Sequence, residues 1–324
     1  MNPPNKPQSM RPSISIIVPA YNAEPYIEAT LESIRNQSFT EWECIVVDDG
    51  SSDGTWKAVQ ASVLLDSRIR GISRPNSGAA ASRNAGYAEA TPSSKYVVFM
   101  DADDLYLKDA LQTLHDAAEA RPDLVGAHGI AEYIDSEGRP FHPGFFANYG
   151  RDRLHLQGGR LRPLSTSSPT NLAVLLLKAF HPPGTFIVRR DVINQVGTMD
   201  SQLLLQEDWD YWLRVARHGD FAFIDQVLLH YRKHNTNTSG NVKKSYRLAR
   251  YVRFKTFSDP KNTPVQKDLI QRCYQAWQMH RIREKFEEFK AVRGSDILFQ
   301  SLRFALHAFF HTACYMRGYP TRRF

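Results

Sequence analysis

The sequence has few cysteines and no long uninterrupted apolar run, and both absences restrict its class. The 324 residues hold only three cysteines, which lie far apart and outside any metal-ligand spacing. That usage fits packing roles in a reducing compartment and argues against a disulfide scaffold. The longest apolar stretches, residues 172–180 and the interrupted series 297–315, are too short or too broken to span a bilayer.

The first 12 residues also lack the apolar core of a secretion signal. They are polar and rich in proline, which predicts a disordered leader over residues 1–12. We therefore expect a cytoplasmic protein. Its net charge of +7 and pI near 9.2 favour anionic partners such as nucleotide phosphates or acidic phospholipid. No recognisable nucleic-acid-binding module accompanies this charge, so we expect no nucleic-acid partner.

Strand-like and helix-like segments alternate through the first 120 residues. Short apolar runs predict strands, and apolar residues at helical spacing predict helices. The predicted strands are residues 13–19, 43–47, 68–73 (an edge strand) and 97–100. Four helices are predicted: one that carries Ile27, Leu31 and Ile34, one that runs from an N-cap at Thr55 through Val59, and two that span residues 79–90 and 108–120. This alternation predicts an α/β fold with a doubly wound, mostly parallel sheet flanked by helices.

Polar residues follow each of these strands. In a parallel sheet the loops after successive strands share one crevice, where ligands bind. The residues brought together in this way are Tyr21 and Asn22, Asp48 and Asp49, Asn76 and Gly78, and Asp101 and Asp103. Four consecutive polar loops rarely arise by chance, so the pattern predicts a ligand site at this edge.

Three acids follow the fourth strand directly. Residues 97–100 form a continuous apolar run, typical of a strand buried on both faces, and Asp101, Asp103 and Asp104 come after it. Carboxylates in this spacing offer hard oxygen ligands to a divalent cation. Aspartate is also common in turns because its side chain bonds to its own backbone, so on these residues alone both interpretations stay open.

The remainder of the chain contains further elements and one long segment without a clear pattern. Residues 124–133, 182–188 and 221–229 predict strands, residues 171–180 a short helix, and residues 206–214 a helix with an acidic first turn. Residues 139–170 are rich in glycine, proline, arginine and aromatics and predict an irregular insertion, either a lid or a plain excursion of the chain.

Residues 241–324 are basic and aromatic and predict a helical extension. Its last helix places Leu298, Leu302, Ala305, Phe309 and Ala313 on one face. Such helices pack on a protein core more often than on a bilayer, so we favour packing on the preceding domain. Peripheral contact with an acidic membrane surface, at the inner face of the membrane, stays open as the alternative.

Five ordered stretches resemble the family 2 inverting glycosyltransferases, which have the GT-A fold. They are Ile16-Ile-Val-Pro-Ala-Tyr-Asn22, Val46-Val-Asp-Asp-Gly-Ser-Ser-Asp-Gly-Thr55, Asn76-Ser-Gly-Ala-Ala-Ala-Ser-Arg-Asn-Ala-Gly86, Phe99-Met-Asp-Ala-Asp-Asp104 and Glu207-Asp-Trp209. Each motif alone is weak, whereas the ordered set is specific. The resemblance implies a GT-A domain over residues 13–240, with 139–170 as its insertion.

The resemblance also implies a nucleotide-sugar donor site. Pro19, Ala20 and Tyr21 would line the base and ribose, and Asp49 would accept the N–H of a uracil base. Asn76, Gly78 and Arg83 would complete the base and diphosphate pocket, with Asp101 and Ala102 beside the ribose. The alternatives are a turn former at Asp49, a helix cap at Asn76 and a surface cation at Arg83.

A metal and a catalytic base follow from the same resemblance. Asp103 would ligate Mg²⁺ or Mn²⁺, with His234 completing the metal or diphosphate site, and Asp104 would be a turn and helix-start residue. Asp208 would be the base that activates an acceptor hydroxyl, and Glu207 is its competitor. Trp209 would contact the acceptor sugar, unless it serves the core.

The expected function is therefore an inverting, divalent-metal-dependent glycosyltransferase. It would move a sugar from a nucleotide-sugar donor, UDP-linked by preference, to a hydroxyl of a glycan or lipid-linked glycan acceptor in surface polysaccharide synthesis. The alternative from another class is a catalytically silent GT-A module that binds nucleotide or glycan as a scaffold. The presence of both Asp103 and Asp208 argues against that alternative.

Overall fold

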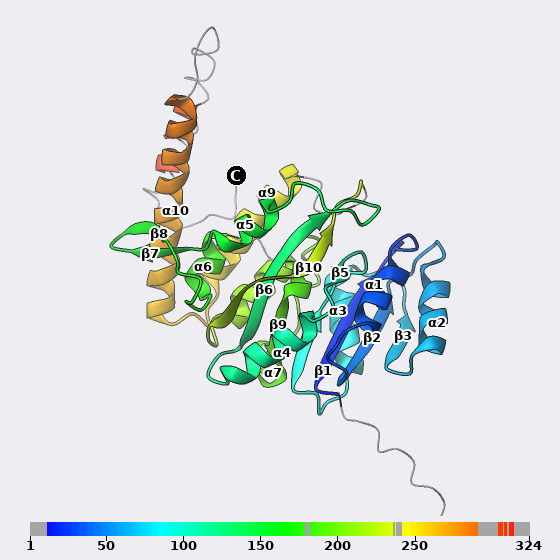
Figure 1. Cartoon of the computed structure of the whole chain (residues 1–324). Coiled ribbons are helices and arrows are strands. Elements are labelled where there is room, and N and C mark those ends of the chain that lie inside the picture. The colour runs from blue at the N-terminus through cyan, green and yellow to red at the C-terminus, as the bar shows by residue number, and fades with distance from the viewer. Residues whose placement is uncertain are drawn as a thin grey trace, which may run out of the picture.

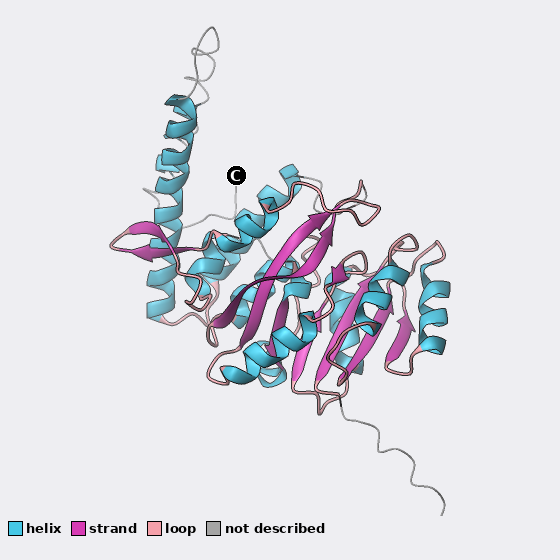
Figure 2. Cartoon of the chain, in the orientation of Figure 1, coloured by secondary structure: helices cyan, strands magenta, loops and turns pink. Residues whose placement is uncertain are grey.

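The fold is built on one central sheet with helices against both faces (Figures 1 and 2). The structure, a computed structural model, describes residues 12–178, 182–235, 237, 242–290, 304–306, 308–309 and 311–313. Within these residues the sheet has eight strands in the order β3-β2-β1-β4-β9-β6-β10-β5. The predicted disordered leader lies almost wholly outside the described residues, which begin at residue 12.

The N-terminal half of the sheet is parallel. Its strands are β3 (Ile69–Ser73), β2 (Trp42–Asp48), β1 (Ile14–Ala20) and β4 (Tyr96–Phe99), with β3 at the edge as predicted. Hydrogen bonds pair β1 with β2 on one side and with β4 on the other, both in parallel register. Strands that are covered on both faces need apolar side chains on both, which explains the uninterrupted apolar runs in the sequence.

The C-terminal half is mixed. β9 (Phe186–Arg189) runs antiparallel to both of its neighbours, β4 and β6 (Gly126–Ile134). β10 (Phe221–Arg232) pairs with β6 in parallel, and the short β5 (Leu105–Tyr106) pairs antiparallel with β10. The predicted mostly parallel α/β sheet is confirmed, with β9 and β5 as its antiparallel members.

Two hydrophobic cores lie on opposite faces of the sheet. Along β4 the side chains alternate, so Val98 packs into one core and Val97 and Phe99 pack into the other. The first core is covered by α1 (Ile27–Arg35), α2 (Thr55–Leu65) and α4 (Ala110–Ala120). The second is covered by α3 (Ala79–Glu89), α6 (Leu172–Leu177), α7 (Arg190–Val196) and α8 (Glu207–Val215).

Two local predictions are wrong. Gly54, not Thr55, occupies the N-cap of α2, because Thr55 is the first helical residue and its Oγ1 accepts the Ala23 N–H at 2.8 Å. The strand predicted from residue 182 begins only at Phe186. A 3₁₀ turn, η1 (Pro183–Thr185), comes first, since two consecutive prolines supply no N–H groups for a strand ladder.

Residues 139–170 are not irregular, contrary to the prediction. They contain α5 (Phe145–Arg151) and an antiparallel hairpin of β7 (Leu154–Gln157) and β8 (Arg160–Pro163). The hairpin turn is Gly158-Gly159, with φ of +55° and +72°. Glycine adopts this left-handed conformation without strain, and a Gly-Gly pair between two short runs is a hairpin signal that the sequence interpretation missed.

The C-terminal extension packs on the second core, as favoured from the sequence. α9 (Val242–Ser258) contacts α8, and the first half of α10 (Pro264–Lys290) contacts α6. Val252, Ile270 and Cys273 are buried there. Figure 1 shows α10 continuing past the body of the molecule. The helix predicted around residues 298–313 lies mostly outside the described residues, and no described helix is long and apolar enough to cross a membrane.

Candidate active site

A cavity of about 650 Å³ lies at the carboxyl ends of β1, β2 and β4. The structure brings nearly all of the predicted site residues to its wall. These are Pro19, Ala20, Tyr21, Asp49, Asn76, Gly78, Arg83, Asp101, Ala102, Asp103, Glu207, Asp208 and His234. The predicted crevice is therefore present, and the loops that form it come from segments about 200 residues apart in the sequence.

Asp49 fixes the loop that carries Asn76 and Gly78. Its buried carboxylate accepts the Ser77 N–H at 3.0 Å and the Gly78 N–H at 2.8 Å. These bonds join two loops, so Asp49 does more than form its own turn, and Gly78 rather than Asn76 caps α3. A carboxylate has about four acceptor positions, which leaves capacity for a donor on a ligand. The assignment of Asp49 to a base N–H stays a prediction.

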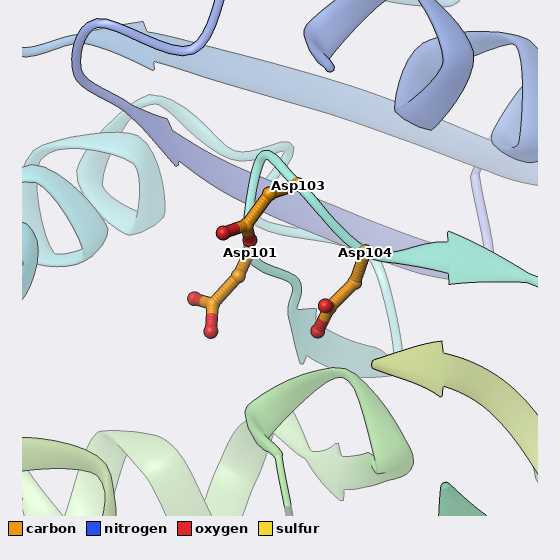
Figure 3. A group of neighbouring side chains, drawn as sticks. All are labelled: Asp101, Asp103 and Asp104. Carbon is orange, nitrogen blue, oxygen red and sulfur yellow. The ribbon is translucent and has the colours of Figure 1, made fainter. Parts of the chain in front are cut away.

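The three aspartates after β4 surround one short turn that leads into β5 (Figure 3). One carboxylate oxygen from each of Asp101, Asp103 and Asp104 lies within 4.8 Å of the others. Asp103 Oδ2 lies 2.8 Å from His234 Nε2 and accepts a bond from Asn237 at 3.3 Å. The predicted proximity of Asp103 and His234 is thus present in the structure.

Asp104 closes the turn after β4, as predicted, but it does not start a helix. It is fully buried, α4 begins only at residue 110, and its Oδ1 accepts the Arg232 N–H at 3.0 Å. Its Oδ2 has no hydrogen-bond partner among the described residues. Burial, reinforced by the charges of Asp103 and Asp101, raises the pKa of the Asp104 carboxyl well above its ordinary value.

This group of acids fits a divalent cation. Burial also raises the pKa of Asp101, and Asp103 adds to the effect, although Arg83 opposes it. Closely spaced, poorly compensated carboxylates are stabilised by a cation, and carboxylate oxygens are the ligands that Mg²⁺ and Mn²⁺ prefer. The unpartnered Asp104 Oδ2 and the adjacent His234 ring extend the donor set. The residues present therefore suit the divalent cation that the sequence predicted at this place.

Arg83 joins the two acidic parts of the cavity. Its guanidinium donates to Asp101 Oδ1 at 2.6 Å and to Glu207 Oε1 at 2.7 Å, and only 4% of its side chain is exposed. Burial alone lowers the pKa of an arginine, but here Asp101, Glu207 and Asp208 outweigh it and the pKa of Arg83 is raised. The surface-cation interpretation is wrong.

The pKa of the Asp208 carboxyl lies well above its ordinary value. It lies in the first turn of α8 and is partly buried, and its Oδ1 accepts the Trp209 N–H at 2.7 Å. Burial raises the pKa of Asp208 to about 7, with Glu207 and Asp101 adding to the shift and Arg83 opposing it. Glu207, by contrast, is bound to Arg83, which makes it the weaker candidate for a base.

Trp209 belongs to the core, so its predicted contact with an acceptor is wrong. Its side chain is 3% exposed, and its indole N–H donates to the Leu175 carbonyl at 2.7 Å. It is not among the described residues that line the cavity. The next acid, Asp210, is also structural, because it pairs with Arg214 at 3.1 Å and Lys255 at 2.9 Å.

Several wall residues were missed from the sequence. Tyr26 packs against His234 with the rings tilted and their centroids 4.5 Å apart, and Asn237 bonds to Asp103. Gln206 precedes α8 with a φ of +64°, a strained value for a residue with a side chain. An asparagine three residues after a candidate metal-site histidine was the available signal for Asn237. Tyr26 and Gln206 carry no local pattern that distinguishes them.

Solved structures with this arrangement are GT-A glycosyltransferases. The structure of S. aureus TarS 1–349 in complex with UDP-GlcNAc matches with a TM-score of 0.60 and 19% identity, covering 95% of this chain and 89% of that one. The mannosyltransferase PcManGT from Pyrobaculum calidifontis, in complex with GDP-Man and Mn²⁺, matches with a TM-score of 0.58 and 19% identity, covering 96% of this chain and 86% of that one. At these identities the likeness establishes the GT-A fold.

The family follows from sequence. The model of glycosyl transferase family 2 matches residues 15–197, more than half of the chain. An uncharacterised glycosyltransferase of Haemophilus influenzae is 30% identical over 232 residues, which cover 70% of this chain and 68% of that protein. The chain belongs to glycosyl transferase family 2.

Two further relatives come from Bacillus subtilis. TuaG, named for teichuronic acid biosynthesis, is 44% identical over 103 residues, which cover 32% of this chain and 40% of TuaG. GgaA, named as a minor teichoic acid biosynthesis protein, is 39% identical over 106 residues, which cover 32% of this chain and 24% of GgaA. The matches thus span less than half of the length of these two relatives.

Proposed function

We propose that this protein is an inverting, metal-dependent glycosyltransferase that moves a sugar from a nucleotide-sugar donor to an acceptor hydroxyl. One observation carries the proposal: a single cavity holds Asp101 and Asp103 on one side and Glu207 and Asp208 on the other, with Arg83 bonded to Asp101 and Glu207. A transferase needs both parts, since the first accommodates a leaving diphosphate with its cation and the second activates the incoming hydroxyl.

The donor is proposed to be a nucleoside diphosphate sugar, UDP-linked by preference. The neighbouring structures contain UDP-GlcNAc or GDP-Man, which supports the class of donor and leaves the base open between uracil and guanine. Asp49 would accept the ring N–H of either base. Tyr21, 54% exposed at the cavity wall, would cover the base and ribose.

Asp103 and His234 would hold Mg²⁺ or Mn²⁺, with Asp101 close by. When bound, the cation offsets the negative charge that grows on the leaving diphosphate. Arg83 would keep Asp101 and Glu207 in place and contribute positive charge to the cavity wall, where the sequence predicts it beside the diphosphate.

Asp208 would take the proton of the acceptor hydroxyl. A carboxylate with a pKa of about 7 is ionised in a large fraction of molecules at neutral pH and is basic enough to accept a proton as the hydroxyl attacks. Attack from the side opposite the departing diphosphate inverts the sugar carbon. The names of TuaG and GgaA support an acceptor in the synthesis of a surface polysaccharide, free or lipid-linked.

The test combines donor binding and turnover. A thermal-shift panel of UDP, GDP and dTDP sugars with Mn²⁺ should raise the melting temperature for the cognate donor, because a ligand that binds the folded form stabilises it. Release of the nucleoside diphosphate from that donor should then stop when a chelator is added and resume when excess Mn²⁺ is restored. Undiminished turnover in chelator would refute metal dependence.

A further inference from the structure

A second cavity, of about 470 Å³, lies between the β7–β8 hairpin and α10. Figure 1 shows the hairpin against α10, at the end of the molecule away from β3 and α2. The cavity is lined by Leu156, Gly158, Gly159, Arg160, Leu161, Arg272, Gln275, Ala276, Met279, His280 and Arg283. Its volume falls within the range of small-ligand sites.

The wall of this cavity is basic. Arg160 comes from the hairpin, and Arg272 and Arg283 come from α10, with His280 between them. None of the described residues that line the cavity carries a carboxylate. At its edge Arg272 pairs with Asp268, and this ion pair is weak because both side chains are largely exposed. Planar guanidinium groups on facing elements suit phosphate or carboxylate oxygens.

The hairpin turn shapes one side of the cavity. Gly158 and Gly159 both have left-handed φ values, and a Cβ placed on either would meet no atom within 4 Å. The turn is thus held by backbone conformation and its outer side is open, so an extended ligand can run past it. Apolar side chains, among them Leu156, Leu161 and Met279, supply the remaining surface.

Positive charge is unevenly distributed along the chain. Residues 241–324 contain 18 lysines and arginines against six acids, whereas residues 1–240 contain 23 against 28. The net positive charge of the protein therefore resides in its C-terminal part, although α10 itself, residues 264–290, holds six lysines and arginines against four acids. Such an asymmetry draws anionic partners toward that part.

We propose that this cavity, which we call the hairpin groove, is a second, non-catalytic binding site for an anionic glycan chain that carries phosphate or carboxylate groups. The groove would hold the acceptor glycan while the end of that glycan reaches the active site, and this role rests on the proposed function. The binding of an anionic glycan to the groove does not depend on the proposed function. The insertion 139–170 would then contribute to recognition through its hairpin, together with α10, and not as a lid on the donor cavity.

Two observations argue against other polyanions, and the acceptor of the proposed function supplies the choice of a glycan. No phenylalanine, tyrosine or tryptophan is present among the described residues that line the groove, whereas single-stranded nucleic acids are commonly held by bases stacked on such rings. The site is also a groove between two elements and not a flat apolar face, which is the geometry that an interfacial membrane helix presents.

The experiment measures direct binding by fluorescence anisotropy with three labelled probes. These are an alginate oligosaccharide (carboxylates), a poly(glycerol phosphate) oligomer (phosphodiesters) and neutral dextran. The full-length protein should bind at least one anionic probe, more weakly as salt rises, and should not bind dextran. Preference between the two anionic probes identifies the charged group.

Arg160→Gln with Arg283→Gln should weaken that binding by about tenfold or more, since two charge-assisted contacts are lost. Both side chains are exposed, so the double variant should keep the wild-type melting temperature. The matched control is Lys57→Gln with Arg121→Gln, which removes the same charge from exposed positions on α2 and just after α4. Its affinity should remain within about twofold of wild type.

Three results would overturn the proposal. These are no binding of either anionic probe, equal losses in the test and control variants, or binding only to acidic phospholipid vesicles with the same arginine dependence, which would make the groove a lipid site. A thermal shift with UDP and Mn²⁺ on the same wild-type preparation reports on the donor cavity separately. Failure of the groove is thereby distinguished from failure of the proposed function.

Discussion

The two acidic groups that face the main cavity use their carboxylates in parallel ways. After β4, Asp104 is buried against the Arg232 N–H, Asp101 is bound to Arg83, and Asp103 faces the cavity beside His234. At the start of α8 the same three situations recur in another sequence order. There the acid away from the cavity is Asp210, and of the two acids that line the cavity Glu207 is bound to Arg83 and Asp208 is not.

The difference between the groups lies in the partner of the acid that faces the cavity. Asp103 has an imidazole and an amide as neighbours, which suits a shared cation. Asp208 accepts only a backbone N–H among its recorded bonds, and burial together with the neighbouring acids raises its pKa to about 7. One carboxylate is therefore placed to bind a cation and the other to accept a proton. The predictions that follow separate these two roles.

The largest effect is expected for Asp208→Asn. An amide is nearly isosteric but cannot take the acceptor proton, so turnover should fall by about a thousandfold, within the range of general-base catalysis. Donor affinity, measured by calorimetry with the nucleotide and Mn²⁺, should change little. Asp210→Asn, two residues away, is the control, and it should lower the free energy of unfolding because Asp210 pairs with Arg214 and Lys255. Loss of nucleotide binding in Asp208→Asn would assign that residue to the donor site.

Asp103→Asn should act on the metal. Replacing a ligating carboxylate by an amide removes one negative charge, and we expect the Mn²⁺ concentration for half-maximal activity to rise by about a hundredfold, in proportion to the loss of affinity. Activity at saturating Mn²⁺ should recover in part. Unchanged metal dependence would remove Asp103 from the cation site. Asp208→Asn serves as the control, since its metal dependence should match wild type.

Arg83→Met should lower the free energy of unfolding. It leaves Asp101 and Glu207 without their shared partner inside the protein, and removal of one member of a buried pair costs about 3–5 kcal/mol. The partial exposure of Asp101, whose side chain is 28% accessible, places the expected loss toward the lower end, about 3 kcal/mol. Urea unfolding provides the measurement. Arg121→Met, in an exposed pair, should leave stability unchanged.

The positions of Asp103 and Asp208 in one cavity could be predicted because they depend on chain order. Parallel strands direct their following loops to one edge, so motifs that follow strands converge whatever the detailed packing. The strands β1 and β4 could be predicted from their apolar runs, and the helices α1, α3 and α4 from their spacing of apolar residues. The spacing of apolar residues and the order of the strands thus determine which loops form the site.

The pairings inside the site could not be predicted in this way. Arg83 and Glu207 are 124 residues apart, and Asp104 and Arg232 are 128 apart, so their contacts depend on how α8 and β10 are placed against β4. No pattern in the sequence around Glu207 indicates that its partner is an arginine 124 residues away. The burial of Trp209 is similar, because its hydrogen bond goes to a carbonyl of α6, 34 residues away.

The pH dependence should follow Asp208. Below its pKa of about 7 the carboxyl is protonated and cannot act as a base, so kcat/KM should fall by about tenfold per pH unit as pH decreases below 7. The raised pKa also means that the folded protein holds this proton more tightly than the unfolded chain does. Its contribution to stability is therefore lost as pH rises from about 4 to 7. A flat profile from pH 5 to 8 would contradict the assignment.

The smallest effect is expected for Trp209→Phe, which tests whether α8 separates its core-facing side from its cavity-facing side. The change keeps an aromatic ring in the core but removes the indole N–H from the Leu175 carbonyl, and an unmet buried acceptor costs about 1–2 kcal/mol. Chemical unfolding should show that loss, while kcat and the KM for acceptor stay at wild-type values because the ring does not line the cavity. A raised acceptor KM at unchanged stability would instead place Trp209 in the acceptor site, and the division of labour along α8 would be wrong.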